Sequence, residues 1–278
     1  MNGSETPGRI AATLVAARQA GRALDGFPGE TPADMTAAYR IQDAAIARWP
    51  DTVAGWKIGF IAADRRSVGE SDRLVGPIWS RGLLAGDADG AAAAGSRVEA
   101  EGPVVEAGIF GDGFAAVEAE FVVRLDEDVP VRSEAWTAEE AARLAQQLRV
   151  GIEVASSPIP DINALGPTVI AADFGNNNGL LVGPELDDPD GAVLRCFVDD
   201  ELLGEGTSAN LPGGLHQGLA TALTVLTARG HTVPAGTLFA TGAITGIHPI
   251  RPGQRCRVEV RGGPSLELRT VDVRSTLG

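Results

Sequence analysis

The chain contains the stretch Val117-Glu118-Ala119-Glu120-Phe121-Val122-Val123-Arg124-Leu125, in which apolar and charged side chains alternate. Because successive side chains of a β-strand point to opposite faces, this pattern predicts a half-buried strand with both glutamates on its second face. Residues two apart on a strand have Cα atoms roughly 6.6 Å apart, so both carboxylates can reach one divalent cation. An E-x-E pair is also typical of a solvent-exposed face, so this stretch alone leaves both interpretations open.

A third glutamate, Glu153, interrupts the apolar run Val150-Gly151-Ile152-Glu153-Val154-Ala155. A buried carboxylate is costly unless it is paired, protonated or bound to a metal, and the nearest cationic residue in the sequence is Arg149. Three carboxylates on two strands suit a hard cation that prefers oxygen ligands, and no Cys or His stands beside them to favour zinc. We therefore predict an Mg²⁺ or Mn²⁺ site formed by Glu118, Glu120 and Glu153.

The composition is that of a globular protein with an acidic surface. The 278 residues are 44% hydrophobic and 22% charged, with a formal net charge of −14. This charge argues against nucleic acid and anionic membranes as partners. No apolar run of about 18 residues predicts a membrane span, and the first residues do not have the pattern of a secretory signal. Cys196 and Cys256 have no metal-binding spacing, so we expect buried thiols and a cytoplasmic protein.

Helical patterns dominate the first part of the chain. Residues 7–24 carry apolar side chains at helical spacing, and a second helix is expected over residues 32–49 with Thr31 as its N-cap. A short strand, Gly55–Phe60, follows and contains Lys57 between two glycines, which permit close approach of other groups. A lysine in such a strand is more often a surface residue than a buried one.

Strands dominate the second part. We expect residues 104–110 and 117–125 to form an antiparallel pair around Gly111–Gly113. A helix is expected to begin at the capping box Thr137/Glu140 and to include Leu148, and an irregular stretch over 156–168 and a strand leading to Asp173 should follow. The last third is expected to contain a hairpin around Asp199-Asp200 and a helix over 215–226 ended by Gly230. Its remaining strands are expected over 237–241, 255–261 and 265–273. This order predicts an α+β fold. The Ala-, Gly- and Asp-rich residues 86–96 suggest a boundary between an N-terminal region, 1–85, and a catalytic domain, 86–278.

The stretch Asp173-Phe174-Gly175-Asn176-Asn177-Asn178-Gly179 is dense in residues that favour turns. It brings amide groups and backbone N–H groups together, so it is either a simple turn or a cradle for an anionic ligand. We predict that Asp173, Asn176, Asn177 and Asn178 bind the substrate.

Several segments in this order resemble the fumarylacetoacetate hydrolase superfamily, and within it the 2-keto-4-pentenoate hydratase and 4-oxalocrotonate decarboxylase branch. They are Ala38-Tyr39-Arg40-Ile41-Gln42, Gly55-Trp56-Lys57-Ile58-Gly59, Glu118-Ala119-Glu120, Gly151-Ile152-Glu153, the Asp173 loop and Thr241-Gly242-Ala243. The resemblance implies a helical N-terminal part followed by a mixed β-roll core, and a homo-oligomer. It also implies that Glu118, Glu120 and Glu153 hold the metal, that Lys57 is an active-site residue and that Thr241 belongs to the substrate site.

The chain departs from the pattern of that branch at three places. Leu74 stands where an acidic residue is usual, with Asp72 nearby. The Asp173–Gly179 loop replaces a D-N-A-S-S-G loop, and Pro158 replaces an arginine after Ser157. These changes fall around the substrate rather than at the metal.

A 2-oxo acid offers a carboxylate oxygen and a keto oxygen to one cation, which would stabilise the enolate formed during reaction. The main expectation is a metal-dependent hydratase of a 2-keto-4-pentenoate-type substrate in aromatic or related catabolism. The alternatives are a 4-oxalocrotonate-type decarboxylase, then an acylpyruvate-type C–C hydrolase, then a non-catalytic metal-binding oligomer. The hydrolase is disfavoured because its His–Glu dyad lies early in related chains, whereas His216, His231 and His248 lie late here.

Overall fold

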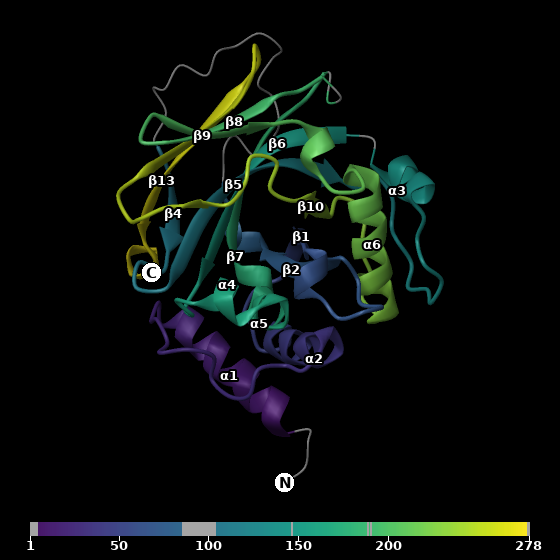
Figure 1. Cartoon of the computed structure of the whole chain (residues 1–278), viewed down its shortest axis with the longest axis vertical. Coiled ribbons are helices and arrows are strands. Elements are labelled where there is room, and N and C mark those ends of the chain that lie inside the picture. Colours follow the sequence, from purple (N-terminus) through teal and green to yellow (C-terminus); the bar gives the residue numbers. More distant parts are fainter. Residues whose placement is uncertain (1–4, 85–103, 146, 188, 190, 277–278) are drawn as a thin grey trace.

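The computed structural model describes residues 5–84, 104–145, 147–187, 189 and 191–276. Two β-sheets form the upper part of the molecule in Figure 1, and the first helices lie below them. The α+β class expected from the sequence is therefore confirmed.

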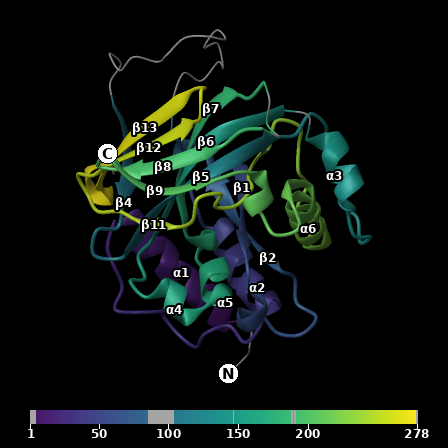
Figure 2. The same ribbon diagram turned by 45° about the horizontal axis from the view of Figure 1, so that its top comes forward.

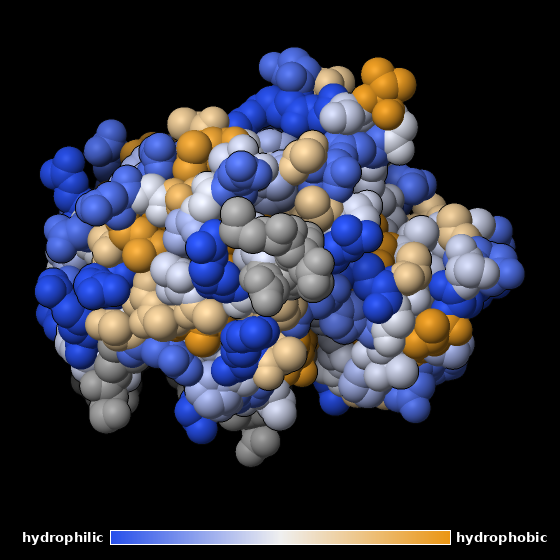
Figure 3. Space-filling model, turned by 90° about the horizontal axis from the view of Figure 1, so that it is seen from below, coloured by the Kyte–Doolittle hydropathy of each residue, from blue (hydrophilic) through white to orange (hydrophobic). Residues whose placement is uncertain are grey.

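Two helices, α1 (Glu5–Gln19) and α2 (Met35–Ile46), form the lower layer. The expectation of Thr31 as N-cap of the second helix is wrong: Asp34 has extended backbone angles, and its side chain accepts a hydrogen bond from the Ala37 N–H at 2.7 Å. The underside of the molecule, where these helices lie, is mostly hydrophilic, with apolar residues in small separate groups (Figure 3). The two helices pack against each other, and α2 also packs against the later helix α5 (Pro167–Ala172).

The first sheet curls into a closed roll. Its strands run in the order β2 (Arg73–Trp79), β1 (Val53–Phe60), β10 (Leu238–Ala240), β5 (Phe114–Arg124), β6 (Gln147–Ser157), β7 (Asn177–Glu185) and β3 (Leu83–Leu84), and β11 (His248–Pro249) also pairs with β5. Strands β2 and β3 lie at opposite ends of this order, yet only the turn Ser80–Gly82 separates them in the chain. The two ends of the sheet must therefore meet.

Closure of the roll corrects the expectation that β5 is half-buried. The predicted apolar face is buried in the main core, and the face that carries Glu118, Glu120 and Val122 is buried as well. Val122 packs inside the roll against Ile78, Leu180 and Ala240. Alternation along one strand identified the two faces correctly, but it could not show that the sheet would cover the second face with its own strands.

The second sheet lies over the first, as Figure 2 shows for β8, β12 and β13 above β5 and β6. Its order is β4 (Val105–Ile109), β13 (Ser265–Asp272), β12 (Arg255–Val260), β8 (Leu194–Val198) and β9 (Glu201–Gly206). The hairpin of β8 and β9 is confirmed, with Asp199 and Asp200 at φ 47° and 66°. Positive φ at both turn residues matches the twist of the flanking strands.

The expected antiparallel pair of residues 104–110 and 117–125 is wrong. β4 pairs in parallel with β13 in the second sheet, whereas β5 pairs with β6 in the first. The turn at Gly111–Gly113 exists, but it carries the chain from one sheet to the other. Period-two patterns identify strands without identifying their partners.

The capping box of Thr137 and Glu140 is confirmed at the start of α3 (Ala138–Leu144), but Leu148 lies in β6 instead of this helix. Residues expected to be irregular or extended form α4 (Ile162–Leu165) and α5 (Pro167–Ala172). Pro167 is suited to a first helical turn, and this outweighs the strand preference of the valine and isoleucine that follow. The helix expected to end at Gly230 is confirmed as α6 (Leu215–Ala228), with Gly230 at φ 83°.

The proposed boundary near residue 85 falls within residues 85–103, which lie outside the described part of the chain. Strands β1, β2 and β3 come from the region before this boundary and pair in one sheet with strands from the region after it. Across the described residues, no helix has the length and apolar character needed to cross a membrane.

Gly76 in β2 marks a close approach that the roll requires. A Cβ atom there would lie 2.1 Å from the carbonyl oxygen of Phe174, so Gly76→Ala must push two backbone segments apart. We expect it to lower the free energy of unfolding by about 1–3 kcal/mol, measured by chemical denaturation. Gly26→Ala is the matched control, because nothing lies within 4 Å of its added Cβ. Equal stability of the two variants would contradict the close approach.

Candidate metal centre and active site

The three predicted glutamates lie together inside the roll. Glu118 on β5 is directly opposite Glu153 on β6, and Glu120 lies two residues further along β5 on the same face. One carboxylate oxygen from each lies within 4.8 Å of the others. Glu118 is 4% exposed and the other two are fully buried. The placement of three carboxylates on two adjacent strands therefore agrees with the sequence prediction.

Lys57 points into the same group from β1. It is in register with Ala240 on β10, and Ala240 is in register with Val122, two residues beyond Glu120. Its ammonium lies 3.2 Å from Glu153 Oε1 and donates to Asn176 Oδ1 at 3.5 Å. At 4% exposure it is not a surface lysine. Three carboxylates and one ammonium leave two formal negative charges in this interior.

The pKa values reflect that crowding. Burial raises the pKa of Glu118 to about 7; Lys57 opposes this shift and Glu153 adds to it. Burial, then Glu153 and Glu118, raise the pKa of Glu120 well above its usual range. Burial by itself acts to lower the pKa of Lys57, but Glu153, Glu118 and Glu120 together outweigh it, so the pKa lies above its usual 10.5. The group therefore accommodates further positive charge.

Carboxylate and amide oxygens that lack hydrogen-bond partners indicate where an additional positive charge would be bound. Among the described residues, Glu120 Oε1, Glu153 Oε2 and Asn177 Oδ1 are buried without a hydrogen-bond partner. The other carboxylate oxygens of these two glutamates accept bonds at 2.9 Å from Gly242 N–H and Asn177 Nδ2. An all-oxygen donor set with free, buried lone pairs fits a hard divalent cation and does not suit a soft one. The residues present therefore fit Mg²⁺ or Mn²⁺.

The Asn-rich loop lies against this group, and its residues have different partners. Asn176 and Asn177 contact Lys57 and Glu153, respectively. Asp173 and Asn178 instead accept hydrogen bonds from Arg18, and Asp173 Oδ2 also accepts from Ser157 Oγ at 2.6 Å. Phe174, Gly175 and Asn176 have φ values of 55°, 64° and 57°, the left-handed conformation expected of such a loop. Substrate binding by its four residues stays a prediction.

Thr241 follows β10 and is held by the neighbouring strand. Its hydroxyl and its N–H both donate to the Phe121 carbonyl, at 3.0 and 3.1 Å. This pairing places the Gly242 N–H against Glu120. The substrate role predicted for Thr241 stays a prediction, and its observed contacts support the strand that carries Glu120.

Lys57, which the resemblance implied, is the only lysine among 278 residues. Arg18 was not inferred from the sequence, although it leaves a signal there. Arg18 follows Ile10 and Leu14 at four-residue spacing, which places it on the buried face of α1. Arg18 also donates to the Ser156 carbonyl at 3.1 Å, close to Pro158, where an arginine was expected from the resemblance.

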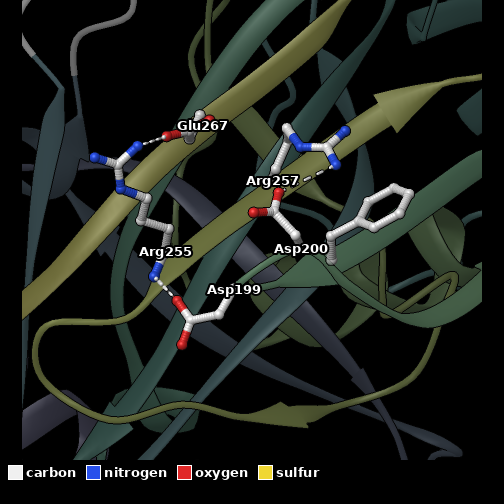
Figure 4. A pocket seen from close by; sticks show the side chains of 6 residues that line it. Asp199, Asp200, Arg255, Arg257 and Glu267 are labelled. Atoms are coloured by element: carbon white, nitrogen blue, oxygen red, sulfur yellow. Dashed lines mark hydrogen bonds and ion pairs between the residues drawn. The ribbon is translucent and has the colours of Figure 1, made fainter.

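Two surface hollows lie elsewhere. One, of about 240 Å³, is on the second sheet between Asp199, Asp200, Arg255, Arg257 and Glu267 (Figure 4). Arg255 pairs with Glu267 at 3.1 Å and Arg257 faces Asp200 at 3.8 Å, so these charges largely satisfy one another. The other hollow, of about 480 Å³, lies beside Phe110, Phe114, Pro249 and Arg251. Neither hollow is lined by the glutamates or by Lys57.

The histidines have other partners. His231 Nε2 lies 3.1 Å from Asp43, His248 Nε2 lies 3.1 Å from Thr245 Oγ1, and His216 is exposed on α6. In the described part of the chain, none of them joins the glutamate group.

No protein-family model matches this chain. It is 28% identical to a 4-oxalocrotonate decarboxylase from a Pseudomonas species over 278 residues, which cover 96% of this chain and 98% of that protein. The structure of 4-oxalocrotonate decarboxylase from Pseudomonas putida G7, complexed with magnesium and adipate, is similar with a TM-score of 0.77 and 19% identity over 98% and 99% of the two chains. Fumarylpyruvate hydrolase from Pseudomonas aeruginosa, in complex with Mn²⁺ and pyruvate, gives a TM-score of 0.51 and 15% identity over 78% and 88%.

The fold is that of fumarylacetoacetate hydrolase-like proteins. The resemblance to that superfamily, and to its hydratase and decarboxylase branch, is confirmed by these matches. The cofactor prediction is supported by the triple-carboxylate group and by similar structures that contain magnesium or Mn²⁺.

The first test of the centre is removal of one ligand charge. Glu120→Gln removes a carboxylate without changing its size and relieves repulsion from Glu118 and Glu153. We expect Mn²⁺ affinity, measured by calorimetry, to fall by at least about 100-fold while the protein stays folded. Glu267→Gln, on the second sheet, should bind Mn²⁺ as the original protein does. Equal affinity of both variants would show that the glutamates are not the ligands.

The charge balance also predicts how Lys57 titrates. Because Lys57 is the only lysine, selective ¹⁵N-lysine labelling gives a single side-chain ammonium resonance. Without metal, its raised pKa should keep the ammonium form above pH 10.5. Added Mg²⁺ should lower this pKa, since a nearby cation disfavours the charged form of a lysine. A resonance that titrates below pH 10.5 in the metal-free protein would contradict this environment.

Proposed function

We propose that this chain is a divalent-metal-dependent lyase that acts on a small 2-oxo acid, and that its reaction is the decarboxylation of a 4-oxalocrotonate-type substrate. The observation that carries the proposal is the buried group of Glu118, Glu120 and Glu153 with Lys57 against it. The decarboxylase relative matches over nearly the whole of both chains, which favours this alternative over the hydratase expected first from the sequence.

In this proposal Glu118, Glu120 and Glu153 hold the cation. When bound, a divalent cation supplies Lewis-acid stabilisation of negative charge on a carbonyl oxygen. The surrounding residues keep the ligands in place: Gly242 N–H holds one oxygen of Glu120, and Asn177 holds one oxygen of Glu153. Because these hydrogen-bond donors already hold the carboxylates in place, the ligands need no rearrangement when negative charge develops on the substrate.

Decarboxylation of a vinylogous keto acid breaks the bond between carbon and the departing carboxylate. The electron pair moves through the conjugated double bond to the keto oxygen, so a dienolate and carbon dioxide are formed, and one proton on the dienolate oxygen then gives the dienol. This proton must be delivered, and Lys57 is the proposed donor because it is held as an ammonium beside Glu153 and Asn176. The predicted substrate residues Asp173, Asn176, Asn177, Asn178 and Thr241 would complete the pocket.

Hydration of a 2-hydroxydienoic acid is the second candidate. It uses the same electron sink and the same proton donor, and it adds water to the conjugated chain instead of releasing carbon dioxide. Its support is the resemblance to the hydratase and decarboxylase branch. A homo-oligomer stays a prediction from that resemblance.

The reactions are separated by their products. Purified protein with Mg²⁺ or Mn²⁺ is given 4-oxalocrotonate and, separately, 2-hydroxypenta-2,4-dienoate, while carbon dioxide release and conjugated absorbance are followed. We expect metal-dependent carbon dioxide release from the first compound. Loss of absorbance from the second without carbon dioxide would favour the hydratase. No turnover of any 2-oxo acid by metal-loaded protein would leave a non-catalytic metal-binding protein.

Lys57→Met tests the proton donor. It keeps most of the bulk of the side chain and removes the ammonium, so turnover should fall by roughly 10²–10⁴-fold. Mn²⁺ affinity should be retained or increased, because a positive charge near the carboxylates is lost. Near-unchanged kcat at every pH would reject Lys57 as the donor. Circular dichroism and metal binding serve as the controls for folding.

A further inference from the structure

Arg18 joins the first helix to the deepest part of the roll. Its guanidinium makes a bidentate pair with Asp173, with Nε donating to Oδ1 at 2.7 Å and an Nη donating to Oδ2 at 2.8 Å. It also donates to the carbonyls of Ser156, Asp173 and Asn177 and to Asn178 Oδ1, at 3.1 to 3.2 Å. At 4% exposure it is surrounded by these acceptors and by the rings of Phe110 and Phe174.

Two of these acceptors lie close to the candidate metal ligand Glu153, one on its own strand and one on the neighbouring strand. Ser156 is three residues after it on β6, and Asn177 begins the next strand, β7. With its backbone carbonyl held by Arg18, Asn177 directs its side-chain Nδ2 to Glu153 Oε1 at 2.9 Å. That bond leaves Glu153 Oε2 and Asn177 Oδ1 as buried oxygens without partners in the described structure.

We propose that Arg18 is a positioning residue for the metal centre, which acts through Asn177 to fix the carboxylate of Glu153. This inference rests on the proposed function, because it takes Glu153 to be a metal ligand. A carboxylate that must adopt one orientation binds a cation more tightly when a neighbouring donor already holds its other oxygen. Although the first helix is far from Glu153 in sequence, it thereby sets the affinity of the three glutamates for the metal.

A guanidinium suits this task better than an ammonium. Its planar fork reaches a carboxylate and several carbonyls at once, whereas an ammonium has three donors on a flexible stem. Arg18→Lys should therefore keep the charge opposite Asp173 and lose part of the loop contacts. Arg18→Met removes the charge and every donor.

The experiment measures the dissociation constant of Mn²⁺ by calorimetry for the full chain, with circular dichroism to confirm folding. We expect Arg18→Met and Asn177→Ala each to weaken Mn²⁺ binding by about 10- to 100-fold, and Arg18→Lys to weaken it less than Arg18→Met. The double variant Arg18→Met/Asn177→Ala should bind within about threefold of Asn177→Ala alone, because a residue that acts through Asn177 has no effect once that side chain is absent.

The matched control is Arg229→Met. Arg229 also joins parts of the chain far apart in sequence, through hydrogen bonds to Gln42 and Asp43, and these two partners lie on α2 and not in the Asp173 loop. It should lower the melting temperature and leave Mn²⁺ affinity unchanged. If Arg18 has a purely structural role, Arg18→Met should likewise lower the melting temperature and leave Mn²⁺ affinity unchanged.

The possible outcomes separate the two hypotheses. If the original protein binds no Mn²⁺, the metal-dependent function is rejected together with this inference. If it binds Mn²⁺ and folded Arg18→Met binds equally well, or the losses in the double variant add, only the role of Arg18 is rejected. Should Arg18→Met fail to fold, Arg18→Lys and Asn177→Ala decide, and unchanged affinity in either rejects the proposal.

Discussion

The burial of three carboxylates beside one ammonium is the constraint on which this structure depends. Each glutamate loses its hydration inside the roll, and each repels the others, so burial is tolerated only with compensating donors and charge. Those groups come from distant segments: Lys57 from β1, Gly242 after β10 and Asn177 from β7. The closed sheet is what brings these segments around β5 and β6. The candidate chemistry and the topology therefore depend on each other.

The N-terminal helices belong to this arrangement and are not a separate cap. Arg18 of α1 holds the Asp173 loop, and Gln42 of α2 donates to the carbonyls of Val75 and Ala171 at 2.8 and 2.7 Å. These bonds tie α2 both to β2 and to α5, the helix that leads into the loop. The buried pair of Arg18 and Asp173 is costly to break from one side, because the remaining charge would be left without a partner. Under the proposal for Arg18, a change in the first helix would therefore reach the candidate metal ligands without contacting them.

The residues of the site restrict the class of chemistry, but they do not single out one reaction within that class. A metal held by three glutamates, with an ammonium nearby, can stabilise an enolate and deliver a proton. Hydration and decarboxylation of conjugated 2-oxo acids share both requirements, and they differ in whether water enters or carbon dioxide leaves. That difference depends on how the substrate is oriented and on where water can reach it. The resemblance implies that the departures from the branch pattern at Leu74, Pro158 and the Asp173 loop fall around the substrate, and they make substrate orientation the property to examine.

The sequence by itself determined the α+β class, the capping box of α3, the hairpin at Asp199-Asp200 and the three glutamates with Lys57, because each depends on local spacing or on residue types that a motif preserves. Tertiary structure decided strand partners: β4 and β5 have the alternation of a hairpin, yet each pairs elsewhere, since period two carries no information about the neighbouring strand. Tertiary structure also decided the burial of the glutamates, because the polar face of a strand is expected to be solvent-exposed unless the closed sheet covers it. The contacts of Arg18 join residues up to 160 positions apart in the sequence, and only the folded chain brings those residues together.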